Sequence, residues 1–104
     1  MLATGIPQFL RAAVLAAALA VAGCQTAPVQ EMSDARQAIM VAREAGAEKH
    51  AATQLSAAVD FLQSAEEFLN HRKYSMAKRD AINAKNSAIE ALRRTESETG
   101  VEQH

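Results

Sequence analysis

Alanine at helical spacing limits what this chain can fold into more than any other feature of its sequence. From Gln25 onward there are sixteen Ala, against seventeen Val, Ile, Leu, Met, Phe and Tyr residues together. Intervals of three and four residues mark one face of a helix. One such stripe consists of Tyr74, Ala77, Ala81, Ala84, Ala88 and Leu92. Small side chains let helices approach closely but fill only a thin core, so we expect one small all-α domain.

Three helical segments follow from this spacing. The first begins at Ser33 or Asp34, because both residue types cap helix N-termini, and it ends before Gly46. The second is expected at about 52–70 and the third at about 73–95. Only "NHRK" separates these two, and a connection this short makes them antiparallel. The sequence therefore predicts an antiparallel helical hairpin plus a short N-terminal helix over residues 33–95, followed by a polar tail at 96–104.

Two charged residues interrupt the apolar stripes of this hairpin. If the turn centres near His71 and Arg72, Glu66 faces the neighbourhood of Ala77 and Lys78. We predict that Glu66 and Lys78 form an ion pair across the hairpin, which requires an N···O distance of about 4 Å or less. The alternative is that the lysine extends to water beside an exposed glutamate.

The N-terminal segment has the layout of a secretory signal peptide. Arg11 precedes the apolar run "AAVLAAALAVAG", which ends directly at Cys24, the only cysteine. The run is shorter than the roughly 20 residues that a helix needs to span a bilayer. A single cysteine excludes an intramolecular disulfide and leaves a zinc site without its usual thiolates.

The segment "VAGC" resembles the lipobox of bacterial lipoprotein signal peptides, with its positions filled by Val21, Ala22, Gly23 and Cys24. The resemblance implies cleavage between Gly23 and Cys24, a diacylglyceryl group on the Cys24 sulfur and acylation of the new N-terminus. Residues 1–23 are then the signal peptide, and 24–32 are the lipidated cysteine and a tether. Gln25, in place of Asp, resembles the default for sorting to the periplasm-facing leaflet of the outer membrane.

A longer resemblance covers residues 35–92. "AREAGAEKHA", a Leu and Ala ladder and Tyr74 at the head of the alanine stripe resemble an alanine-rich helical domain of unknown function found in small bacterial lipoproteins. The last element is also similar to a tetratricopeptide hairpin. The family's Pro is replaced by Ala52 here, so the first two helices are separated by Gly46 alone or form one long bent helix. The family's Gly-Asp is replaced by Arg72-Lys73, which puts a strained turn residue at Asn70 or His71.

Charge is unevenly distributed along the chain. Residues 31–70 hold three Lys and Arg against seven Asp and Glu, whereas residues 71–94 hold seven against two. The basic third helix is either offered to an anionic partner, such as lipid headgroups or cell-wall polymer, or packed against the acidic first two helices. An acidic mature chain in the cell envelope disfavours nucleic acid as a partner.

Residues suited to catalysis or metal binding do not form a recognisable pattern. His50, His71 and His104 share no metal-ligand spacing. A phosphate-binding glycine loop and a nucleophile motif are both absent from the sequence. We therefore expect no enzyme, no metal and no cofactor besides the covalent lipid on Cys24.

The function expected from these features is that of a structural or adaptor module in the cell envelope. Its partners would be the membrane, through the N-terminal lipid, and an envelope protein or the cell wall. One alternative is a module that binds a peptide or peptidoglycan fragment in a groove between helices. Another is a helical lipoprotein that completes its thin core by self-association.

Overall fold

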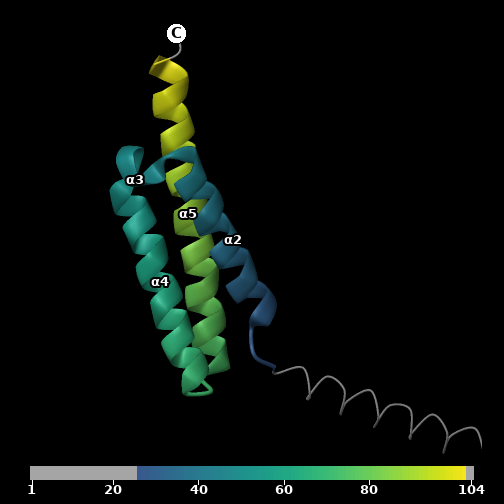
Figure 1. Cartoon of the computed structure of the whole chain (residues 1–104). Helices are drawn as coiled ribbons and strands as arrows, with labels where there is room; N and C mark the ends of the chain where they lie inside the picture. The colour runs from purple at the N-terminus through teal and green to yellow at the C-terminus, as the bar shows by residue number, and fades with distance from the viewer. Residues whose placement is uncertain (1–25, 103–104) are drawn as a thin grey trace, which may run out of the picture.

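The computed structural model describes residues 26–102, which form helices and no strand. They are α2 (Val29–Ala45), α3 (Ala47–His50), α4 (Ala52–Asn70) and α5 (Tyr74–Glu102). The all-α class is confirmed. Helices α4 and α5 form the antiparallel hairpin, α2 lies along it, and the short α3 joins α2 to α4 at the far end (Figure 1).

The core between the three long helices is built largely from alanine. The alanines of the predicted stripe on α5 have no exposed area, and neither has Ala91, whereas Tyr74 and Leu92 at the ends of the stripe are half-buried. Larger side chains lie at its two ends. Ile39 and Leu55 belong to a cluster near α3, whereas Met32 packs with Ala65 and Ala81 nearer the hairpin turn. The alanine spacing thus identified the buried face of α5, because a residue without a long side chain allows close helix packing.

Gly46 ends α2 and separates it from α3. Its φ of 101° is left-handed, and its N–H donates to the Arg43 carbonyl at 3.0 Å. Only glycine adopts this conformation without strain. The alternative of one long bent helix is wrong, because α3 and then the non-helical Ala51 come between α2 and α4.

The left-handed residue of the α4–α5 turn is not one of the two that the sequence suggested. The Lys73 N–H donates to the Phe68 carbonyl at 2.8 Å and the Arg72 N–H to the Leu69 carbonyl at 3.0 Å. These two bonds form a Schellman motif, which requires left-handed backbone dihedrals at the residue that donates the second bond. Arg72 is that residue, with a φ of 59°. The strained position is therefore Arg72 rather than Asn70 or His71.

Two helix ends differ from the prediction. Helix α2 begins at Val29, not at Ser33 or Asp34, with Pro28 as its N-cap. Burial of Met32, which is only 1% exposed, favours this earlier start. Helix α5 continues to Glu102, so residues 96–102 are helical where a polar tail was expected.

Candidate functional site

The expected lipidation residues lie outside the described part of the chain. Val21, Ala22, Gly23 and Cys24 all precede Thr26, the first residue that the structure describes. Among residues 26–102, no helix combines the length and the apolar character that crossing a membrane requires.

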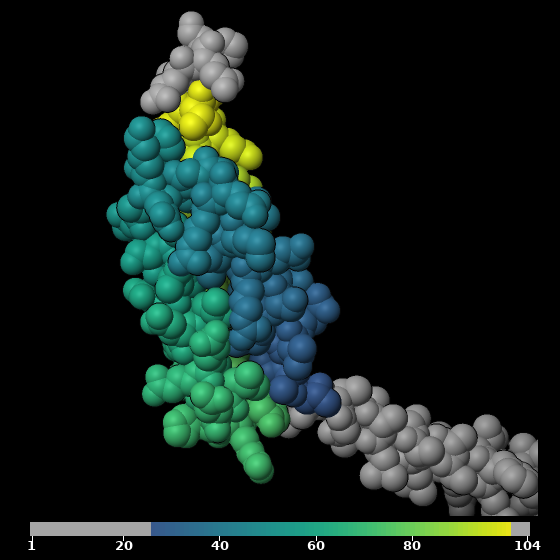
Figure 2. Space-filling view, viewed as in Figure 1, coloured from purple at the N-terminus to yellow at the C-terminus, as the bar shows by residue number. Residues whose placement is uncertain are grey.

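A groove lies where the described chain begins, and we call it the basal groove. It has a volume of about 580 Å³. The start of α2 and the α4–α5 turn lie at the same end of the molecule (Figure 2). The groove is lined by Thr26, Ala27, Pro28, Glu31, Arg72, Lys73, Tyr74, Ser75, Met76 and Lys78.

Positive charge dominates the basal groove. Its lining contains Arg72, Lys73 and Lys78 but only one carboxylate, that of Glu31. Lys78 Nζ lies 3.7 Å from Glu31 Oε1, and no ion pair within the described residues involves Arg72 or Lys73. Helices α2 and α5 both start here, and helix N-termini carry partial positive charge. The groove is therefore suited to an anion.

The predicted ion pair between Glu66 and Lys78 is wrong. Glu66 Oε1 lies 3.3 Å from Arg36 Nη2, and Lys78 pairs with Glu31. Both new partners belong to α2. The reasoning from the sequence considered the hairpin alone, whereas α2 lies along it and supplies the opposite charge to each residue.

A second groove, which we call the lateral groove, runs between α2 and α5 and has a volume of about 390 Å³. Its apolar lining includes Val41, which is 43% exposed. The neighbouring Met40 is 55% exposed. The groove is lined by Asp34, Gln37, Ala38, Val41, Lys85, Ala88, Ile89 and Leu92. It is suited to an apolar side chain or helix face.

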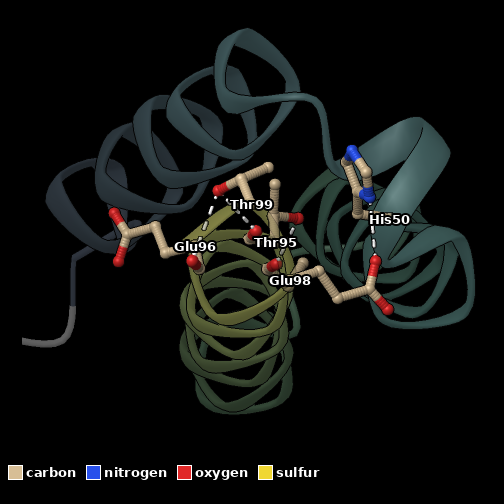
Figure 3. A network of polar contacts seen from close by, with 6 residues as sticks. His50, Thr95, Glu96, Glu98 and Thr99 are labelled. Carbon is tan, nitrogen blue, oxygen red and sulfur yellow. Dashed lines mark hydrogen bonds and ion pairs between the residues drawn. The ribbon is translucent and has the colours of Figure 1, made fainter. Parts of the chain in front are cut away.

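A polar contact at the opposite end joins α3 to α5. His50 Nδ1 lies 2.8 Å from Glu98 Oε2, and the two side chains point toward each other (Figure 3). Nearby, the Thr95 hydroxyl is buried and donates to the Ala91 carbonyl at 2.8 Å. Reasoning from the sequence missed this contact because it placed Glu98 in a tail. Within residues 26–102, no three His, Cys, Asp or Glu side chains form a possible metal-binding group.

Asp80 is the most deeply buried carboxylate among the described residues, at 5% exposure. The Ser64 hydroxyl donates to Asp80 from α4, and Arg79 Nη2 lies 3.1 Å from its other oxygen. A buried polar group that is satisfied in this way contributes to the structure of the hairpin. We assign Asp80 and Ser64 a role in holding α4 on α5.

Comparison with known proteins returns no matching family model, no matching curated protein and no matching solved structure. The resemblance to the alanine-rich lipoprotein domain stays a prediction.

Proposed function

We propose that this chain is a lipid-anchored protein of the bacterial cell envelope, attached through Cys24. The support is the "VAGC" segment at the end of the apolar run, together with the position of its cysteine. Two or more acyl chains, at about 0.8 kcal/mol per buried methylene, would anchor the protein stably. We place it on the periplasm-facing leaflet of the outer membrane because Gln25 follows the cysteine.

The early start of α2 brings the bundle close to the anchor. Only residues 25–28 separate Cys24 from α2. The five residue steps from Cys24 to Val29 span at most about 18 Å. A tether of this length would hold the bundle against the membrane rather than let it reach across the periplasm.

We propose that the anchored bundle acts as an adaptor, and the lateral groove is the observation that supports this role. Its lining includes the apolar residues Ala38, Val41, Ile89 and Leu92. An apolar helix of another envelope protein would bury these side chains, in the helix-in-groove mode of recognition. A sugar-rich wall fragment would leave its hydroxyl groups poorly matched there.

Self-association is a second candidate, favoured by the exposure of Val41, which lines this groove, and of Met40, its neighbour in the sequence of α2. A second copy that covered them would also extend the thin alanine core. Association stabilises the folded state by mass action, so melting temperature would then rise with protein concentration.

The lipid anchor is tested by the intact mass of the protein extracted from membranes. We expect a chain that starts at Cys24 and carries added acyl mass. A Cys24→Ser variant is the control, and it should lose the acyl mass. An unmodified product from the native chain would contradict the anchor.

The adaptor role is tested by placing a photo-crosslinking amino acid at Ile89, in the lateral groove, within the native membrane. The matched control position is Asp60, which is exposed on α4. We expect a specific adduct with another envelope protein at position 89 only. A dimer adduct would favour self-association instead, and equal labelling at both positions would reject the groove as a docking site.

A further inference from the structure

We propose that the basal groove binds the headgroups of anionic phospholipids in the membrane that holds the Cys24 lipid. This inference rests on the proposed lipid anchor and adds a second attachment to it. The basal groove would then be a membrane-contact surface that fixes how the bundle stands on the bilayer.

The position of the groove along the chain supports this occupant. Thr26 lines the groove, and Cys24 lies two residues before it. Two residues span at most about 7 Å. Acyl chains on Cys24 would therefore enter the bilayer within a headgroup's distance of the groove, which leaves membrane lipid as its nearest abundant anion.

The charge of the groove is complementary to phosphate. Arg72 and Lys73 are exposed and have no carboxylate partner among the described residues. Arginine and lysine both form charge-assisted hydrogen bonds with phosphate oxygens. Cations near an anionic membrane surface each strengthen binding by about fivefold.

Exposed apolar side chains at this end favour a lipid surface over free phosphate. Val29 is 69% exposed at the start of α2, and Met76 is 40% exposed in the first turn of α5. Met76 also lines the groove beside the cations. Apolar side chains next to basic ones are typical of segments that lie at the boundary between headgroups and acyl chains.

The test uses the mature chain, residues 24–104, with Cys24→Ser, so that binding reports the groove without the lipid. Its helicity is first verified by circular dichroism. Co-sedimentation is then measured with vesicles of phosphatidylcholine containing about 30% phosphatidylglycerol, and with vesicles of phosphatidylcholine alone. We expect binding to the anionic vesicles only, and weaker binding as salt is added.

The decisive variant removes the two groove cations that have no carboxylate partner in the described part of the chain, as Arg72→Gln with Lys73→Gln. Its matched control removes two exposed cations that do not line the groove, one on α3 and one on α5, as Lys49→Gln with Arg93→Gln, which changes net charge equally. We expect about a 30-fold loss of binding to anionic vesicles in the first variant and at most about a twofold loss in the control. Equal losses, or no loss, would overturn the inference.

Two further measurements separate this inference from its rivals. Displacement from the vesicles by inorganic phosphate at constant ionic strength would make the groove a site for free phosphate and overturn the lipid assignment. The mass of the native protein tests the anchor independently. If Cys24 is acylated but the Arg72 and Lys73 variant binds normally, the inference alone fails. If Cys24 is unmodified but the variant loses binding, the anchor alone fails.

Discussion

Two left-handed residues end two of the long helices, and they are chemically unlike. Gly46 follows α2 with a φ of 101°, and Arg72 follows α4 with a φ of 59°. A left-handed conformation costs a residue with a Cβ roughly 1 to 2 kcal/mol, whereas glycine avoids this strain. The left-handed backbone is therefore unstrained at Gly46, after α2, and strained at Arg72, after α4.

Replacing Arg72 by glycine should stabilise the protein. We expect Arg72→Gly to raise the free energy of unfolding in urea by about 1 kcal/mol, because it relieves the left-handed strain. Lys73→Gly is the control. Its backbone is not left-handed, so it should give no gain. A decrease for Arg72→Gly would mean that its side chain contributes more to stability than the strain costs.

Replacing each of the two described glycines by alanine should change the free energy of unfolding in opposite directions. Gly46→Ala should lower the free energy of unfolding by about 1 to 2 kcal/mol, because alanine is strained at a φ of 101°. Gly100→Ala should raise it slightly, by at most about 1 kcal/mol. Position 100 lies within α5, and an added Cβ meets nothing within 4 Å. Thermal unfolding of both variants checks the pair, and a shift of the same sign in both would contradict it.

At the scale of elements, α2 decides where the charges of the hairpin pair. Its Arg36 bonds Glu66 on α4, and its Glu31 contacts Lys78 on α5. These side chains are partly exposed, so each pair contributes little to stability. The two pairs mainly report how α2 is positioned against α4 and α5.

A double-mutant cycle tests this arrangement. Alanine at Arg36 and Glu66 should give a coupling energy of about 0.2 to 1 kcal/mol at low salt. The cycle between Glu66 and Lys78 should give a coupling near zero. The measurement is urea unfolding of the single and double variants. A larger coupling for Glu66 with Lys78 would restore the pair expected from the hairpin alone.

The alanine stripe of α5 should not tolerate a larger side chain. Ala84→Leu should lower the free energy of unfolding by about 2 to 3 kcal/mol, because Ala84 is fully buried and the helices would have to separate. Ala52→Leu, at an exposed position of α4, is the control and should change it by less than about 0.5 kcal/mol. Equal effects in thermal unfolding would mean that the helices can separate without cost.

Features that depend on local residue spacing could be predicted from the sequence, whereas features determined by tertiary contacts could not. The bounds of α4 and the stripe on α5 follow from the 3.6-residue period. The start of α2 depends on burial of Met32, and the extension of α5 beyond residue 95 includes Glu98, which contacts His50 on α3. For the site, "VAGC" is readable from neighbouring residues. The basal groove is not, because Thr26 and Arg72 meet only after folding.

The whole molecule has two unlike ends. The described chain starts beside the basal groove, where Arg72 and Lys73 have no ion-pair partner among residues 26–102. The far end is joined by the contact between His50 and Glu98. The lateral groove runs along the side between α2 and α5. If the basal end lies on the membrane, the lateral groove faces the periplasm between α2 and α5, where a partner protein would bind it.

A single substitution at Arg72 should raise stability and weaken membrane binding. If the basal groove binds anionic headgroups, Arg72→Gly removes a cation from the groove while it relieves the left-handed strain. We expect the same protein sample to gain about 1 kcal/mol in urea unfolding and to bind anionic vesicles about fivefold more weakly. Functional sites often retain strained residues for this reason. Arg72→Lys keeps the charge and the left-handed strain, so it should leave both quantities nearly unchanged. If Arg72→Gly were more stable and bound equally well, the strain would have no connection with the membrane surface.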